Sequence, residues 1–349
     1  MFYNSDMKSR SRIRLDYEPY ILRLRHPFRV AWGSRETTPV VLTQLEMDGH
    51  IGYGEASMPP YLGESVESVA RFLGRVDLND VSDIQDIENV VSYLDDLAPG
   101  NYAAKAAVDI ALHDLLGKVW GEPWFLRYGY DPGNAPCTSI TIGIDDTEVV
   151  KLKVREAESY AILKIKLGGT NDREIIRAVR AETDKPLYAD ANSAWTDKQR
   201  ALDMIFWLRD MGVILMEQPM PCEMSGELSW LKDHSPLPLF GDEGLKTIDD
   251  LKRFGGLYHG VNIKLMKCGG MFNANRMIQL AREMGIKVMI GCMTETSCAV
   301  SAAAQLSPAA DYADLDGNLL ISNDCFDGMK VVDGRIVLHN LPGIGVEKK

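Results

Sequence analysis

Residues 163–169 read Leu-Lys-Ile-Lys-Leu-Gly-Gly and end an apolar run that begins at Ala161. Because side chains of a β-strand alternate between its two faces, Lys164 and Lys166 are expected to point the same way. One interpretation is a solvated strand edge, on which the lysine stems lie against apolar surface and the charges stay in water. The other is a strand end that opens into a functional site, and the spacing of the following segments decides between them.

Four further apolar runs end in a charged residue, at Asp190, Glu217, Asp242 and Lys264. Counted from Lys166, the steps between these residues are 24, 27, 25 and 22. Each step has the length of one strand, one helix and two turns, and repeated units of this kind form a barrel of parallel strands. Catalytic residues of such barrels lie at the carboxyl ends of the strands. The spacing therefore predicts that the five side chains meet at one mouth, and it favours the functional interpretation of the lysine pair.

The chemistry of these residue types indicates a metal site. Three carboxylates without a histidine or cysteine form a hard oxygen site, which suits Mg²⁺ or Mn²⁺ and is poor for Zn²⁺. A lysine on each side would place a base on either face of the α-carbon of a carboxylate substrate. A lysine base needs a pKa lowered from about 10.4 toward roughly 7 to 8, and we expect the charges of Lys164 and the metal to lower it.

The same residues resemble the signature of a known family, the muconate lactonizing enzyme subgroup of the enolase superfamily. The similarity extends over almost the whole chain and is carried by Lys164-x-Lys166, Asp190, Glu217, Asp242 and Lys264. It implies an α/β fold, a modified TIM barrel with an N-terminal α+β capping domain. It also implies that Asp190, Glu217 and Asp242 bind the metal, and that Lys166 and Lys264 are the catalytic acid and base.

Length and composition agree with two domains. The 349 residues, of which 46% are hydrophobic, suit one barrel of about 200 to 250 residues and a smaller unit. A turn-rich segment from Leu126 to Ala135 is typical of a domain junction. We expect a capping domain over residues 1–130, a barrel with the metal site over residues 131–325, and a C-terminal segment, residues 326–349, that returns to the capping domain.

The N-terminal third predicts an antiparallel sheet followed by helices. Residues 13–24 and 40–47 are expected strands, and Asp48-Gly49 predicts a hairpin into a third strand. Between the first two strands, the Pro, Gly and Ser of residues 26–35 predict a loop. This loop resembles the mobile flap that closes over the barrel mouth in the superfamily; an ordinary surface connection is the alternative. The helices are expected at residues 65–73, 84–97 and 102–119.

The charge balance and the apolar segments limit the partners. A net charge of −12 and a pI of about 5.1 argue against nucleic-acid binding, which needs a basic surface. Residues 1–12 are polar and no apolar stretch approaches 18 residues, so we expect neither a signal peptide nor a membrane span. The expectation is a soluble cytoplasmic protein; a homo-oligomer is compatible with the sequence.

The eighth predicted strand narrows the reaction. It ends in Asp314-Leu315-Asp316, which places two carboxylates on one face, where they repel each other unless a cation lies between them. Among the relatives, this Asp-x-Asp resembles that of the dipeptide epimerases, in which it binds the α-ammonium group of the substrate. A solvated acidic turn is the alternative. Lys164 is expected both to tune the base and to donate to the substrate carboxylate.

Further contacts are expected from the flap and from other strand ends. Ala-Glu epimerases similar to this chain carry a flap arginine that pairs with the Glu side chain. An alignment from Pro27-Phe28 places Gly33 at that position, and we expect Arg35, two residues on, to take the role. The other expected substrate contacts are Thr138, Met293 and Thr294. Asn192, Asn262 and Glu295 are expected either to hydrogen-bond the metal ligands or to bond structurally.

Together these patterns predict a Mg²⁺-dependent dipeptide epimerase that inverts the α-carbon of the C-terminal residue by two-base 1,1-proton transfer. The expected substrates are L-Ala-D/L-Glu or related Xaa-Glu dipeptides from murein, which would connect the enzyme to cell wall recycling. The alternatives are a cycloisomerase, an o-succinylbenzoate synthase or an N-acylamino acid racemase. A barrel that only binds a ligand or partner is disfavoured, because all five core residues are present.

Overall fold

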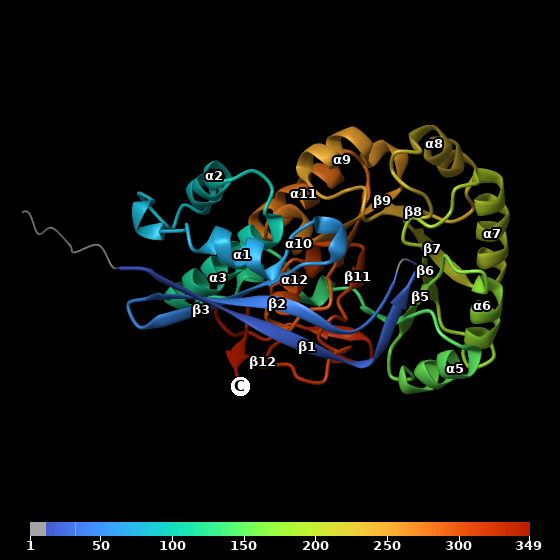
Figure 1. Cartoon of the computed structure of the whole chain (residues 1–349), viewed down its shortest axis with the longest axis horizontal. Coiled ribbons are helices and arrows are strands. Elements are labelled where there is room, and N and C mark those ends of the chain that lie inside the picture. Colours follow the sequence, from blue (N-terminus) through green and yellow to red (C-terminus); the bar gives the residue numbers. More distant parts are fainter. Residues whose placement is uncertain (1–11, 32) are drawn as a thin grey trace, which may run out of the picture.

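The computed structural model describes residues 12–31 and 33–349 and shows a small antiparallel sheet beside a parallel barrel (Figure 1). The sheet has the order β1-β2-β3, with β1 at Arg14–Val30, β2 at Gly33–Met47 and β3 at His50–Ser57. The predicted polar N-terminus, except Arg12, and Trp32 of the predicted flap lie outside the described residues. The expected fold, a modified TIM barrel with an N-terminal α+β domain, is confirmed.

The expected loop at residues 26–35 is wrong, because β1 and β2 continue through it as one long hairpin. The register shifts between Arg23 and Phe28, after which Phe28 pairs with Arg35 and Val30 pairs with Gly33. An irregularity of this kind accommodates Pro27, which has no N–H to donate. The hairpin tip reaches the barrel, where Ile144 N donates to Arg29 O at 2.9 Å (Figure 1).

Helices cover the antiparallel sheet close to the positions that the sequence predicts. The longest of them is buried over most of its length, and it packs directly on β3. A Cβ added at Gly52 would lie 2.1 Å from Ala111 O, and one at Gly54 would lie 2.0 Å from Ala107 O, so only glycine permits this approach. The helices are α1 (Val66–Leu73), α2 (Ile87–Leu97), α3 (Tyr102–Trp120) and α4 (Trp124–Arg127).

Eight parallel strands form the barrel in sequence order. A bridge between Thr138 and Ala313 joins the first strand to the last. The strands are β4 (Ser139–Ile142), β5 (Ile162–Lys166), β6 (Leu187–Asp190), β7 (Val213–Glu217), β8 (Leu239–Gly241), β9 (Gly260–Lys264), β10 (Lys287–Gly291) and β11 (Tyr312–Asp314). The helices after these strands are α5 (Thr147–Glu156), α6 (Asp172–Arg180), α7 (Lys198–Asp210), α8 (Ser225–His234), α9 (Ile248–Phe254), α10 (Leu265–Cys268), α11 (Met271–Glu283) and α12 (Ser297–Ala304).

The C-terminal segment contacts both parts of the molecule. Two short antiparallel pairs make up its strands: β12 (Phe326–Asp327) with β15 (Glu347–Lys348), and β13 (Lys330–Val332) with β14 (Arg335–Val337). Gly334 O accepts from Thr138 N at the barrel, whereas Ile344 N donates to Asp114 Oδ1 in α3. The division of the chain near residues 130 and 325 remains a prediction.

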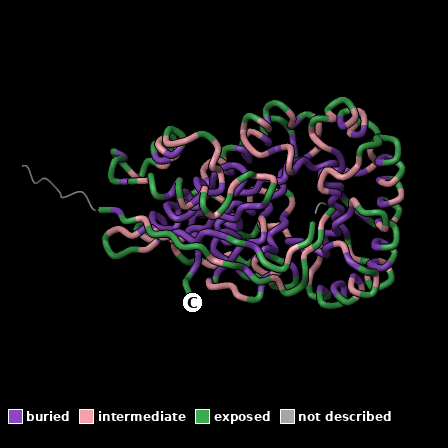
Figure 2. Tube along the Cα trace, viewed as in Figure 1, coloured by how far each residue is buried: buried purple, intermediate pink, exposed green. Residues whose placement is uncertain are grey.

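Buried residues run without interruption from the antiparallel sheet into the barrel (Figure 2). One apolar cluster includes Leu22 and Leu112 of the N-terminal part as well as Ile165 and Ile263 of the barrel strands. The two parts therefore share a core, which holds the hairpin tip over the barrel mouth. Within the described part of the chain, no helix is long and apolar enough to cross a membrane.

Candidate active site

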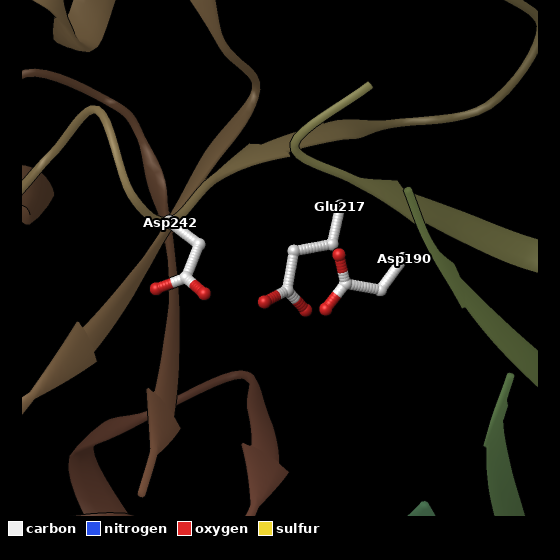
Figure 3. A group of neighbouring side chains, drawn as sticks. All are labelled: Asp190, Glu217 and Asp242. Atoms are coloured by element: carbon white, nitrogen blue, oxygen red, sulfur yellow. The ribbon is translucent and has the colours of Figure 1, made fainter. Parts of the chain in front are cut away.

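Strand register brings the three predicted metal ligands to the same edge of the barrel. Asp190 is paired in register with Glu217 on β7, and Asp242 directly follows β8. All three are buried, and each offers an oxygen that lies within 4.8 Å of the others. Figure 3 shows the three carboxyl groups pointing toward one another from neighbouring strands.

The donor set fits a hard divalent cation such as Mg²⁺. All the ligand atoms are carboxylate oxygens, which Mg²⁺ prefers to nitrogen or sulfur. Glu217 Oε2 is buried and, within residues 12–31 and 33–349, has no hydrogen-bond donor. Lys164 Nζ lies 2.8 Å from this oxygen but outside hydrogen-bond geometry. The triad therefore retains an oxygen that a cation would satisfy.

Lysines flank the triad at both ends. Lys166 Nζ lies 2.6 Å from Asp190 Oδ2, and Lys164 Nζ lies 3.1 Å from the same oxygen. At the other end, Lys264 Nζ lies 2.8 Å from Asp242 Oδ2. The two predicted catalytic lysines thus sit at opposite ends of the carboxylate row.

These contacts set the protonation of the carboxylates. Burial alone would raise the pKa of Asp190 and Asp242, but the neighbouring lysine charges outweigh it, so the pKa of Asp190 is lowered and that of Asp242 is well below its usual value. Glu217 lies between them, and burial, which outweighs the charge of Lys164, raises its pKa to about 8. The ends of the row stay ionised, whereas the central glutamate depends on a further positive charge.

The pKa of Lys264 is shifted in the direction opposite to that expected. Burial lowers it, but the surrounding acidic groups, Asp242 first and then Tyr61 and Glu217, together outweigh burial, and the pKa is raised well above its usual value. The pKa of Lys164 is raised in the same way, with Asp314 and Glu217 as the main opposing charges. The carboxylates favour the charged, protonated form of each lysine, which cannot act as a base. A second cation at the triad would offset their charge and favour the neutral form.

The two aspartates of the eighth strand have different partners. Asp314 Oδ2 accepts from Lys164 Nζ at 2.7 Å, and its Oδ1 accepts from Ser139 Oγ at 2.7 Å. Asp316 Oδ2 accepts from the backbone N–H of Thr141 at 2.7 Å. Burial and the charge of Asp314 raise the pKa of Asp316 to about 6. Lys164 therefore hydrogen-bonds Asp314, whereas the hydrogen bond of Asp316 comes from the backbone.

A cavity of about 520 Å³ connects these groups with the hairpin. Lys164, Lys166, Lys264, Asp314 and Asp316 line it from the barrel. Its other wall comes from the antiparallel sheet and the segment after it, so both parts of the molecule enclose the space. That wall includes Phe28, Arg35, Ser57 and Tyr61.

Arg35, the predicted contact of the substrate side chain, lines this cavity. Its guanidinium lies over the ring of Phe28, 5.2 Å from the centroid, and its Nη2 donates to Thr294 Oγ1 at 2.9 Å. Arg35 Nε is buried and finds no acceptor among the described residues. Met293 and Thr294 also line the cavity. Thr138 does not, because its hydroxyl accepts from Leu315 N at 2.7 Å where the barrel closes; Thr141 is the threonine of this strand that faces the cavity.

The three expected supporting residues lie around the triad. Asn262 Nδ2 donates to Glu217 Oε1 at 3.0 Å, and the backbone N–H of Asn192 donates to Asp190 Oδ1 at 2.8 Å. Glu295 is buried beside the seventh strand and accepts from Met293 N at 3.0 Å. Two of the three therefore hydrogen-bond carboxylates of the triad directly.

Lys267 is a site residue that the sequence reasoning missed. It is fully buried on α10, and its Nζ donates to Asp242 Oδ1, Asp242 O and Asn262 O at 2.7, 2.7 and 2.8 Å. Its position one helical turn after Lys264 was the available signal. Gln218 was also missed; its Oε1 accepts from Asp242 N at 2.7 Å. Both residues orient Asp242.

Comparison with known proteins agrees with this geometry. Residues 148–349 match the family model "Enolase C-terminal domain-like" and residues 18–125 match "Mandelate racemase / muconate lactonizing enzyme, N-terminal domain". The chain belongs to the mandelate racemase and muconate lactonizing enzyme family of the enolase superfamily.

Members of this family closely resemble the chain. It is 54% identical to the L-Ala-D/L-Glu epimerase of Bacteroides thetaiotaomicron, over 97% of this chain and 88% of that protein. The substrate-liganded L-Ala-D/L-Glu epimerase from Bacillus subtilis has a TM-score of 0.89 at 26% identity, covering 95% of this chain and 98% of that one. The dipeptide epimerase from Methylococcus capsulatus, complexed with Mg and L-Arg-D-Lys, has a TM-score of 0.87 at 28% identity, covering 96% and 99%. The family member described here is therefore an isomerase, as the sequence predicts.

Proposed function

We propose that this isomerase is a dipeptide epimerase that inverts the α-carbon of the C-terminal residue. The observation that carries the proposal is the pair of lysines at opposite ends of the carboxylate row, Lys166 beside Asp190 and Lys264 beside Asp242. Inversion needs a proton removed on one face of a carbon and another delivered on the opposite face, and two opposed bases supply this. The similarity to the Bacteroides epimerase supports the same reaction.

Asp190, Glu217 and Asp242 would hold the metal, with Mg²⁺ the first choice and Mn²⁺ the second. When bound, the cation would supply positive charge that stabilises the negative charge developing on the substrate carboxylate. Lys164 donates to that carboxylate from the same edge. Its contacts with Asp190 and Glu217 place its ammonium directly beside the triad.

The proton path uses the two catalytic lysines alternately. For one epimer, neutral Lys166 takes the α-proton and the ammonium of Lys264 returns a proton to the other face. For the other epimer, the two roles are exchanged. Each turnover leaves one lysine with a proton gained and the other with a proton lost, and exchange with solvent restores both.

The ends of the substrate are bound by Asp316 and Arg35. Asp316 and Asp314 take the α-ammonium group, because both carboxylates line the cavity beyond Lys164. Arg35 takes the side chain of an acidic C-terminal residue, because its buried Nε needs an acceptor. L-Ala-D/L-Glu and related Xaa-Glu dipeptides of murein have both groups, which would place the enzyme in cell wall recycling.

A dipeptide library incubated in D₂O with Mg²⁺ tests the proposal, with deuterium uptake read by mass spectrometry. We expect exchange at the C-terminal α-carbon and conversion of L-Ala-L-Glu to its epimer. Chelation should abolish both, and Mg²⁺ should restore them. The proposal fails if no dipeptide exchanges, or if N-acetylated amino acids react faster than free dipeptides, which would favour an N-acylamino acid racemase.

A further inference from the structure

The segment after the seventh strand, residues 293–296, is bound by side chains from the N-terminal part of the molecule. Arg35 Nη2 donates to Thr294 Oγ1 at 2.9 Å, and Ser57 Oγ donates to the carbonyl of the same residue at 2.9 Å. The hydroxyl of Tyr61 lies 3.5 Å from Met293 Sδ. Arg35 therefore takes its position from a barrel loop as well as from its own hairpin.

Glu55 of β3 binds the end of this segment from outside the cavity. Its carboxylate is fully buried and accepts from Thr296 N at 3.0 and 3.1 Å, from the hydroxyl of Thr296 and from Ala299 N at 3.4 Å. These donors belong to the first turn of α12, where a carboxylate is favoured by free N–H groups and by the helix dipole. A residue of the antiparallel sheet thus caps a barrel helix.

The barrel confines the same segment from the other side. A Cβ added at Gly317 would lie 2.1 Å from Met293 O, so the eighth strand's loop is in close contact with it. Asp324 Oδ2 accepts from Ser297 Oγ at 2.6 Å just beyond Thr296. Contacts on both sides thus confine the segment, and Glu55 fixes its end at Thr296, two residues after Thr294.

We propose that Glu55 is a positioning residue for substrate selectivity. It fixes Thr296, and through the intervening residues it fixes the Thr294 hydroxyl that orients the guanidinium of Arg35. Glu55 does not line the cavity and touches no reacting group. The inference rests on the proposed function only in naming an acidic side chain as the ligand of Arg35.

The substitution Glu55→Gln tests this role, with Glu64→Gln as the matched control. Glu64 also caps a helix of the N-terminal part, accepting from Ala103 N at 2.9 Å and Ala104 N at 3.2 Å, but it does not line the cavity. Gln at either position replaces a carboxylate, in which both oxygens accept hydrogen bonds, by an amide, in which only one atom accepts them. Only at Glu55 should the loss reach Arg35.

We expect Glu55→Gln to raise KM for L-Ala-L-Glu about tenfold, as for a charge-assisted hydrogen bond moved out of line. KM for the neutral isostere L-Ala-L-Gln and kcat for both should stay within about twofold. Glu64→Gln should leave all four constants within the same range. Equal KM changes for the two dipeptides in Glu55→Gln would overturn the proposal, since a general loosening of the site would act on both.

Amide hydrogen exchange, read by mass spectrometry, tests the coupling between Glu55 and Arg35 without any substrate. In Glu55→Gln, residues 293–299 and 33–38 should both exchange faster, whereas Glu64→Gln should affect only residues near 103. Unchanged exchange at 33–38 would refute the link to Arg35 even if epimerase activity were absent altogether. If Glu55→Gln does not fold, Ser57→Ala removes another bond to Thr294 and should produce the same selective rise in KM.

Discussion

Two aspartates of the triad, on opposite sides of Glu217, are each flanked by a pair of lysines, and the two pairs differ in what they can reach. At Asp190, both Lys164 and Lys166 project from β5 and line the cavity. At Asp242, Lys264 lines the cavity, whereas Lys267 is fully buried on α10 with three protein oxygens around its ammonium.

A lysine–aspartate ion pair can therefore have two different roles in this site. A lysine at a strand end faces the cavity and can exchange a proton or bind a substrate. A lysine on the following helix turn has its donors satisfied by the protein and can only orient a ligand. Burial alone does not distinguish them, because Lys164 and Lys267 are both almost fully buried; the partners of the ammonium group do.

The largest effect should come from removing either lysine at the ends of the row. Lys166→Ala and Lys264→Ala should each lower epimerisation in both directions by about 10² to 10⁴-fold, the usual contribution of a general acid or base. Each variant should still exchange the α-proton of one epimer with D₂O, and the two should prefer opposite epimers. Equal exchange of both epimers in either variant would show that the lysines are not opposed.

A comparison of Lys267→Met with Lys164→Met would separate the orienting from the substrate-facing role. Each breaks a buried ion pair, which costs about 3 to 5 kcal/mol of stability. Lys164 contacts Asp190 and Glu217, and Mg²⁺ on the triad would replace its positive charge there. Lys267 also donates to two backbone carbonyls, and Mg²⁺ would not supply those hydrogen bonds. Mg²⁺ should therefore raise the Tm of Lys164→Met more than that of Lys267→Met, and equal rescue would contradict the distinction.

A smaller effect is expected at the eighth strand, because only one of its aspartates is paired with Lys164. Asp316→Asn should raise KM for free dipeptides about 10 to 100-fold, the loss of one charge-assisted hydrogen bond to the substrate ammonium. An N-acetylated dipeptide, which has no ammonium, serves as the control and should be unaffected. If both compounds suffer alike, Asp316 supports the barrel rather than the substrate.

The effect expected at Glu295, whose neighbours include Lys264, is on stability and depends on pH. Burial, and next the charge of Glu55, raises the pKa of Glu295 to about 8 from 4.5 in the unfolded chain. The stability that protonated Glu295 contributes is therefore complete below about pH 4.5 and is lost as the pH rises through about 8, at about 1.4 kcal/mol per unit of pKa difference. Glu295→Gln stays neutral and should lack this loss. Tm values of both proteins at about pH 5 and about pH 9 measure it, and a constant difference between them would exclude the assignment.

The sequence by itself determined the barrel and which charged side chains gather at its mouth. Residues at the carboxyl ends of successive parallel strands must meet, so the steps from Lys166 to Lys264 placed five side chains without knowledge of any long-range contact. The side-chain period of a strand also placed Lys164 beside Lys166 and Asp314 beside Asp316. These features are local in the chain and repeat regularly, which is why they can be predicted.

Only the tertiary structure decided the contacts between the two parts of the molecule. Residues 26–35 have the composition of a loop, yet pairing along the hairpin and contact with the barrel make them strand. The phase of the first strand turns Thr141, and not Thr138, toward the cavity. Glu55 meets Thr296 across 241 positions of sequence. No local pattern specifies such a pairing, because it depends on how the shared core sets one part of the molecule against the other.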